Sequence, residues 1–303
     1  TIAGDGSLVL KLYFKQQFTV KYLPGVYGTF ETQTYENLDY GSDIPEFSGE
    51  KTGKPGYSFA NWNPTVTGKV TEDKTYTAEW TPNTNTVYTV EYYYQKDGEY
   101  ANTTTEFVSK VGTTDTIVTV EETDKVTSKA GYVFDESASN ILTGTIAGDG
   151  SLVLKVYFKQ QFTIKYVKGE KGTFAEDKHE NLDYGSITPG FGGEKTGLPG
   201  YTFSKWSPDV AETVTEDKTY TAEWTANTNT PYTLHIYGEN AENTEYTFIK
   251  DVTKYGTTDT SINTSEIQEI VEGYGDTSII AKDKLGNIIT NVNINGDGSS
   301  EVY

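Results

Sequence analysis

Two acidic pairs and two histidines are the residues of this sequence whose types could support catalysis. Glu72-Asp73 and Glu216-Asp217 each precede a lysine, and paired carboxylates can act as general acid and base or hold a cation. Adjacent strand residues point to opposite faces of a sheet, so we expect both pairs to be solvated turn residues. His179 and His235 do not recur between the repeats and belong to no triad motif, so we expect surface histidines.

Motifs for cofactors and metals are absent from the sequence. It has no Cys, no phosphate-binding loop, no zinc spacing and no dinucleotide fingerprint. Gly4-Asp5-Gly6 and Gly148-Asp149-Gly150 could suggest calcium, but Ca²⁺ needs about six to eight oxygens and no EF-hand spacing is present, so turns are favoured. We therefore expect no catalytic residue, no cofactor and no metal site, and the protein is not expected to be an enzyme.

The aromatic residues, 24 Tyr, 13 Phe and 4 Trp, predict where the core lies. Along residues 75–80 the side chains alternate, which places Tyr76, Ala78 and Trp80 on one face of a strand. An exposed Trp could stack on a sugar ring, whereas a buried one forms the core of a small domain, and the alternation favours the core. The structural core candidates are Tyr57, Phe59, Trp62, Tyr76, Trp80, Tyr201, Phe203, Trp206, Tyr220 and Trp224.

Some tyrosines lie opposite the predicted core faces of their strands. Tyr13, Tyr93 and Tyr157 are the clearest cases, because each alternates with an apolar set. They are better candidates than the tryptophans for contact with sugars or proteins. Tyrosine is also a common solvent-facing strand residue, so both interpretations stay open.

An internal repeat organises these strands. Residues 1–11 recur unchanged 144 positions later at 145–155, and the match continues to Thr116 and Thr260. Several small cores suit such a chain better than one large core. Strand signals dominate, and weak helix signals occur only at 121–129 and 265–272, so we expect a mainly β fold with a minor α component. The predicted modules are 18–81 and 161–225 of a first type and 87–160 and 231–303 of a second type, with 1–17 as the last strand of a preceding second-type module.

The junctions between the predicted modules are short. Residues 81–86 and 225–230 are polar and leave little freedom, while Lys159–Phe162 contains almost no linker. We expect one strand to pass directly through this second junction and to make it stiff. The strand predicted within 1–17 lacks its sheet, so it is expected to fray or to pair with another molecule. Because the chain opens inside a repeat, we expect it to be a piece of a longer polypeptide.

Charge and composition exclude several classes of partner. The formal net charge is −20, and the chain has no Arg, so binding to nucleic acid or to anionic membranes is not expected. No apolar run approaches the ~20 residues of a membrane span, so no membrane insertion is expected. The absence of both Cys and Met suits an exposed, oxidising location.

Specific motifs resemble known repeats of Gram-positive surface proteins. The first-type module, with Gly56–Trp62 and Thr75–Trp80 and their second copies, is similar to the Listeria–Bacteroides repeat, also called the internalin B-repeat type. The second-type module, with Tyr88–Tyr94, Asp97-Gly98 and Gly148–Tyr157, resembles the mucin-binding-protein (MucBP-like) repeat. The resemblance implies small β-grasp-like domains in secreted, usually wall-anchored proteins that act in adhesion or hold an adhesive tip away from the cell.

These observations together predict a structural protein. We expect tandem small β-grasp-like domains in an elongated array, as a monomeric rod in the stalk of a bacterial adhesin. The expected location is extracellular, at the cell surface. The alternative is an adhesion module that binds host mucin, another glycan or a host surface protein.

Overall fold

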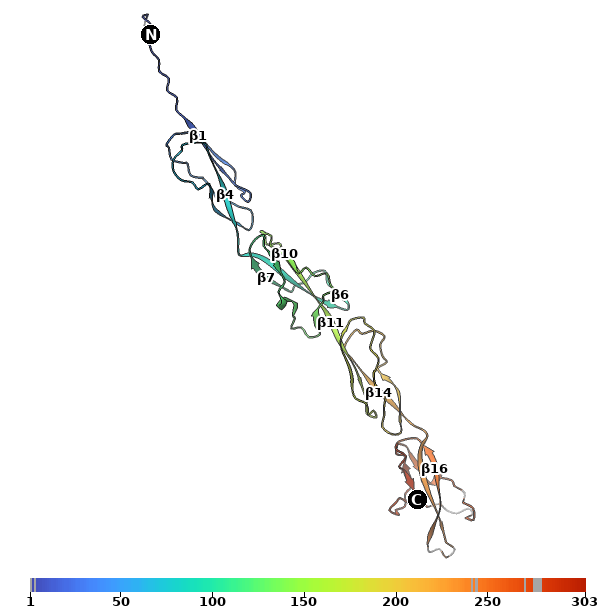
Figure 1. Ribbon diagram of the computed structural model, residues 1–303. Coiled ribbons are helices and arrows are strands. Elements are labelled where there is room, and N and C mark those ends of the chain that lie inside the picture. The colour runs from blue at the N-terminus through green and yellow to red at the C-terminus, as the bar shows by residue number, and fades with distance from the viewer. Residues whose placement is uncertain (1, 3, 241, 243–244, 270, 275–279) are drawn as a thin grey trace. The chain divides into compact units, whose positions relative to one another are not determined.

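The computed structural model consists mainly of β-strands and describes residues 2, 4–240, 242, 245–269, 271–274 and 280–303. It divides into two compact units, Thr1–Lys159 and Gln160–Tyr303. We refer to residues 17–82 and 160–226 as the first and third segments, and to residues 86–159 and 230–303 as the second and fourth. The mainly β fold predicted from the sequence is confirmed (Figure 1). The module boundaries stay predictions.

The first segment forms a four-stranded sheet in the order β2-β1-β4-β3. Its strands are β1 (Gln17–Leu23), β2 (Gln33–Asp39), β3 (Tyr57–Asn63) and β4 (Lys74–Pro82). β1 is central, antiparallel to β2 and parallel to β4, while β3 is antiparallel to β4 with a bulge after Phe59. The alternation predicted on β4 is confirmed, because Tyr76 and Ala78 are buried and Thr75 and Glu79 are exposed.

The core of the first segment is aromatic. Val20, Tyr22, Val70 and Tyr76 are buried, and Tyr22 lies at the centre of the ring contacts. Its ring centroid is 4.7 Å from that of Trp62 and 5.3 Å from that of Tyr76, and its hydroxyl donates to the Pro45 carbonyl at 2.7 Å. A small sheet with one buried face needs such large side chains to exclude water.

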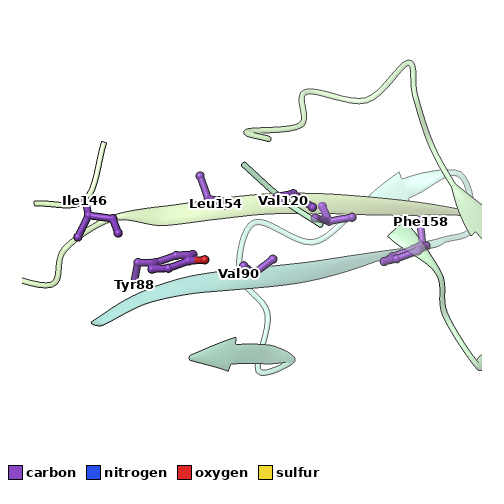
Figure 2. Packing of buried hydrophobic residues seen from close by; sticks show 7 residues of the cluster. Tyr88, Val90, Val120, Ile146, Leu154 and Phe158 are labelled. Carbon is purple, nitrogen blue, oxygen red and sulfur yellow. The ribbon is translucent and has the colours of Figure 1, made fainter. Parts of the chain in front are cut away.

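The second segment is built around a parallel pair of long strands. Its strands are β5 (Thr86–Lys96), β6 (Glu99–Tyr100), β7 (Phe107–Gly112), β8 (Ile117–Thr119), β9 (Tyr132–Phe134), β10 (Thr143–Thr145) and the first half of β11 (Val153–Val167). β5 pairs with β7 antiparallel and with β11 parallel, in the register Val90↔Leu154. Figure 2 shows the buried cluster on these two neighbouring strands, with Tyr88 and Val90 on β5 and Leu154 and Phe158 on β11.

The third segment repeats the first. The second half of β11 takes the place of β1 and pairs with β12 (Asp177–Asp183) and β14 (Lys218–Ala226), and β13 (Tyr201–Ser207) pairs with β14. Its parallel register, Ile164↔Lys218, is that of Val20↔Lys74 displaced by 144 positions. The prediction of one strand through residues 159–162 is confirmed, since β11 is continuous over 15 residues.

The fourth segment resembles the second but carries a shorter closing strand. It contains β15 (Thr230–Glu239), β16 (Tyr246–Gly256), β17 (Ser261–Asn263), β18 (Asn291–Asn293) and β19 (Glu301–Val302). The sheet order is β16-β15-β19, with β19 parallel to β15. Tyr232, Leu234, Val292, Ile294 and Val302 are among its buried residues.

The predicted helices are shorter than the sequence indicated. The segment predicted at 121–129 is a 3-10 helix, η1 (Glu122–Lys125), and that at 265–272 shrinks to η2 (Thr264–Glu266), with residue 270 outside the described part of the chain. Asn263 provides the N-terminal cap of η2, and its side chain accepts a hydrogen bond from the backbone N–H of Ser265. Helices of so few residues do not offset the cost of nucleation, which explains why only single turns form.

The strand predicted within residues 1–17 does not form before Gln17. Leu10, Leu12 and Phe14 are 80%, 82% and 91% exposed. The physical reason is the lack of a partner, because a single strand leaves its backbone groups and its apolar face unpaired. The equivalent residues in β11 are ordered by their pairing with β5.

Candidate functional site

In each acidic pair the aspartate bonds to a strand backbone and the glutamate to a lysine. Asp73 accepts a hydrogen bond from the backbone N–H of Thr19 at 2.7 Å, and Asp217 accepts one from Thr163 at the same distance. In each pair the glutamate instead forms an ion pair with the following lysine. Within the part of the chain that the structure describes, no group of three His, Cys, Asp or Glu side chains could hold a metal.

The histidines are more buried than predicted. The His179 side chain is 28% exposed and its Nε2 lies 3.2 Å from Asp177, whereas His235 is 18% exposed and its Nδ1 lies 2.7 Å from Asp251. His235 also stacks on the ring of Tyr303. Each imidazole is therefore half-buried at the surface of its segment and has a structural contact with a carboxylate.

The tyrosines that were candidates for sugar contact differ in exposure. Tyr93 is buried, with 4% exposure, because its ring stacks on Tyr157 at 4.7 Å and its hydroxyl donates to Glu91. Tyr157 is half-buried and also contacts Tyr100 edge-on. Only Tyr13, 85% exposed, is free to meet a ligand, so the interpretation of Tyr93 as a contact residue was wrong.

The ten core candidates lie in two equivalent clusters, in the first and third segments. Tyr76 and Tyr220 are fully buried, and the other eight are half-buried. The Trp80 indole donates its N–H to the Pro24 carbonyl at 2.8 Å, and Trp224 does the same to Lys168 at 2.7 Å. These tryptophans fasten a loop to the sheet, which limits their use as stacking platforms for a ligand.

The most specific construction in each unit is the joint between its two segments, which we call the intra-unit joint. In the first unit, β4 ends at Pro82 and β5 begins at Thr86, so three residues connect two sheets. Asn83 donates its backbone N–H to the Gly56 carbonyl at 2.8 Å and accepts from the Thr114 N–H at 2.9 Å. One residue of the connection is thus bonded to both segments.

Two glycines bring the backbones together at this joint. Gly56 has φ +83°, which favours glycine, and a Cβ there would lie 2.4 Å from the Cα of Gly148. A Cβ on Gly148 would lie 2.0 Å from the carbonyl oxygen of Pro55. Neither position has room for a methyl group, so the backbones meet only because both residues are glycine.

Polar side chains also form hydrogen bonds at the same joint. The Tyr57 hydroxyl donates to the carboxylate of Asp115, and the hydroxyls of Thr86 and Thr114 are 2.7 Å apart in a buried position. The hydrogen bond to Asp115 raises the pKa of Tyr57. These contacts limit rotation about the short connection, because turning it would leave the buried threonine hydroxyls unpaired.

The second unit contains the same joint. Asn227 bonds to the Gly200 carbonyl and the Thr258 N–H at 2.8 and 2.9 Å, and Gly200 again meets a second glycine, Gly296. Tyr201 donates to Asp259, whose carboxylate also pairs with Lys171 at 3.0 Å, and together these donors lower the pKa of Asp259. Sequence reasoning missed these joint residues, although all of those in the first unit except the second glycine recur 144 positions later, which was the signal that could have found them.

A half-buried ion pair supports the second segment. Lys110 Nζ lies 2.7 Å from Asp124 and 3.1 Å from Glu121, and the Tyr92 hydroxyl donates to Asp124 at 2.8 Å. Burial alone would raise the pKa of Asp124, but the bonds from Lys110 and Tyr92 outweigh it and lower the pKa. Burial and the bond to Asp124 both raise the pKa of Tyr92. In the fourth segment, Lys254 corresponds to Lys110 and forms an ion pair with Glu269.

Asp124→Asn is expected to lower the free energy of unfolding by about 1–3 kcal/mol at neutral pH, because it leaves Lys110 without its buried counter-charge. The lowered pKa of Asp124 means that its contribution is present above the unfolded value of about 3.9 and is lost as the pH falls through the folded pKa. Urea denaturation at several pH values should therefore show a smaller acid-induced loss in the variant. Glu122→Gln, at a side chain 87% exposed, is the control and should change little.

The surface of the third segment carries a lysine-lined hollow. It has a volume of about 310 Å³ and is lined by Thr163, Lys165, Lys178, Asp217, Lys218 and Thr219. Lys178 and Lys218 pair with glutamates at 2.5 and 2.8 Å. Lys165 lies between β12 and β14, in register with Lys178, so its ammonium adds positive charge to the hollow.

None of the helices in the described residues has the length and hydropathy needed to cross a bilayer. With the geometry of the intra-unit joints established, the chain was compared with known proteins. A scan against protein-family models found no match, and neither did a search of the curated proteins.

Proposed function

We propose that this chain is a structural spacer from the extracellular part of a bacterial surface adhesin. The observation that carries the proposal is the intra-unit joint, which occurs in both units with the same glycine contact and the same bridging asparagine. A catalytic or binding protein needs a shaped site, whereas a spacer needs reproducible connections between stable modules. The joints of this chain meet the second requirement, because they connect two segments in the same way in both units.

The sheet order supports the family resemblance as part of this proposal. In the first and third segments a central strand is parallel to one neighbour and antiparallel to the other, which is compatible with a β-grasp-like domain of the internalin B-repeat type. The second and fourth segments would then be MucBP-like modules. In this proposal the four modules form a tandem, elongated array on the surface of a Gram-positive cell.

Small-angle scattering tests the spacer directly. Modules with strands of about eight to ten residues placed end to end give a maximum dimension of roughly 100–150 Å, at about 3.3 Å per residue. A compact globule of the same length has a radius of gyration of about 19 Å. A measured radius near that value would contradict the proposal, whereas one of roughly 30–40 Å supports it.

A second candidate function, binding of an acidic mucin-type glycan, is favoured by the lysine-lined hollow. Lysine ammonium groups attract carboxylate and sulfate groups, and they stand out in a chain of net charge −20. Binding to sialylated or sulfated glycans on an array, lost in Lys165→Ala, would favour this function. Thr34 is the residue of the first segment that corresponds to Lys178 of the third. Lys178→Thr is therefore a matched test of the same site.

A further inference from the structure

Two tyrosine rings lie face to face beside the intra-unit joint of the first unit. Tyr27, in the loop after β1, and Tyr57, the first residue of β3, have ring centroids 3.9 Å apart and ring planes 13° from parallel. Aromatic pairs usually prefer centroids about 4.5–7 Å apart, in offset or edge-on arrangements. Among the tyrosine pairs of the described residues this one has the shortest ring separation, followed by Tyr93 and Tyr157 at 4.7 Å.

Backbone hydrogen bonds hold the two rings in this contact. Lys54 donates its backbone N–H to the Tyr27 carbonyl at 2.7 Å, and Tyr57 donates its own to the Lys54 carbonyl at 3.2 Å. Gly28 and Gly53 pair in an isolated β-bridge next to these bonds. Because both chain segments are fixed against each other, the rings stay in contact, and this raises their effective concentration for a reaction with one another.

Tyr57 also has a proton acceptor in place. Its hydroxyl donates to the carboxylate of Asp115, and this bond, together with burial and the nearby Tyr27, raises the pKa of Tyr57. The phenol is therefore neutral at neutral pH, and a neutral phenol that loses an electron also releases its proton. A carboxylate within hydrogen-bond distance takes that proton and makes the oxidation easier. The Lys54 ammonium lies 5.8 Å from the centroid of the Tyr27 ring and disfavours positive charge there, so Tyr57 is the ring that is oxidised first.

The composition of the chain directs oxidants to its aromatic rings. The sequence has no Cys and no Met, so the sulfur atoms that oxidants usually attack are missing. Tyr27 is 37% exposed and Tyr57 is half-buried, so an oxidant can reach this pair from solvent. In the next closest pair, Tyr93 is only 4% exposed. Proximity, a proton acceptor and access therefore coincide at Tyr27 and Tyr57.

We propose that Tyr27 and Tyr57 are a modification site, at which hydrogen peroxide and a haem peroxidase form a dityrosine cross-link. Each phenol gives up one electron and one proton, a carbon–carbon bond forms between the ring positions next to the two hydroxyls, and the hydrogen on each of these carbons moves to restore the hydroxyls. The two electrons and two protons reduce one hydrogen peroxide to two waters. The link ties the loop after β1 to β3 beside the joint, and it goes beyond the proposed spacer function, which does not require it.

The second unit supplies a matched control, because Lys171 stands where the first unit has Tyr27. Lys171 Nζ lies 4.7 Å from the centroid of the Tyr201 ring and 3.0 Å from the carboxylate of Asp259, to which the Tyr201 hydroxyl also donates. The proton acceptor is thus kept while the second ring is replaced by an ammonium group. Tyr27→Lys gives the first unit this arrangement, and Lys171→Tyr gives the second unit the ring pair.

Peptide mapping after oxidation tests the site. The whole chain is treated with hydrogen peroxide and a haem peroxidase at low protein concentration, and the monomer is recovered by size exclusion and digested after lysine, which separates the two tyrosines at Lys51. We expect mass spectrometry to find their peptides joined, with the loss of two hydrogen atoms. Dityrosine fluorescence of the monomer should exceed that of Tyr27→Lys by at least about tenfold, and Lys171→Tyr should add a second link at Tyr201.

The cross-linked monomer should also unfold at a higher temperature than the untreated chain, because a covalent link between residues 27 and 57 lowers the entropy of the unfolded state. Monomer in which the Tyr27 and Tyr57 peptides stay separate, or in which the links join only other tyrosines such as Tyr93 and Tyr157, would overturn the proposal. Equal fluorescence from the wild type and Tyr27→Lys would overturn it as well. None of these results bears on the spacer proposal, which scattering from the untreated chain tests.

Discussion

Gly148→Ala is expected to open the intra-unit joint of the first unit and to destabilise the contact between its two segments by about 1–3 kcal/mol. A Cβ at this position would lie 2.0 Å from the Pro55 carbonyl oxygen and 3.2 Å from the Cα of Gly56, both of them backbone atoms that cannot rotate away. The segments must therefore separate. Separation breaks the bonds of Asn83 and exposes the paired hydroxyls of Thr86 and Thr114.

Thermal unfolding and NMR alignment of an isolated first unit, Thr1–Lys159, would report this change, with the whole chain measured in parallel. The wild type should show one alignment tensor for both segments, and the variant should show two. Gly4→Ala is the matched control, because Gly4 occupies the same position of the repeat 144 residues earlier and a Cβ there meets nothing within 4 Å. A variant that keeps one tensor and its thermal midpoint would show that the glycine contact does not fix the joint.

The same glycine contact explains how so short a linker can fix the orientation of the two segments that it connects. If only the three residues 83–85 held the segments, their orientation would depend on backbone torsions alone. The glycine contact limits the relative positions that the two backbones can take, and the Tyr57–Asp115 hydrogen bond limits the rotation of one segment against the other. Both features recur in the second unit with Gly200 and Tyr201.

Local patterns carried most of the strand prediction. Alternation along residues 75–80 correctly placed Tyr76 in the core, and the near absence of a linker at Lys159–Phe162 correctly predicted one continuous strand. These features depend on near neighbours in the sequence, which a single sequence displays. The same reasoning failed at residues 8–14, where the pattern was correct but the pairing partner was not present.

Long-range pairing was not accessible from the sequence. The core candidates omitted Tyr22 and Tyr166, which are the central rings of the first and third segments, because their burial follows from β1 and β11 lying in the middle of their sheets. Parallel pairing of β1 with β4 joins residues more than 50 positions apart, and nothing local specifies it. The half-burial of His235 likewise depends on Tyr303, which stacks on it from another strand end.

Tyr22→Ala is expected to unfold the first segment at room temperature, through a loss of about 3–5 kcal/mol. Tyr22 is 1% exposed and its ring contacts Trp62, Phe47 and Tyr76, so removing it leaves a cavity that a small domain cannot refill.

The smaller change Tyr22→Phe should cost about 1–2 kcal/mol, because it keeps the ring and leaves only the Pro45 carbonyl without its donor. Tyr40→Ala, at a residue 65% exposed, is the control and should be nearly neutral. Tryptophan fluorescence and urea titration distinguish the outcomes, since Trp62 and Trp80 report on the first segment and Trp206 and Trp224 on the third. Loss of the first pair's native signal with the second pair unchanged is the expected result, whereas simultaneous loss of both would mean that the segments share their stability and do not fold on separate aromatic cores.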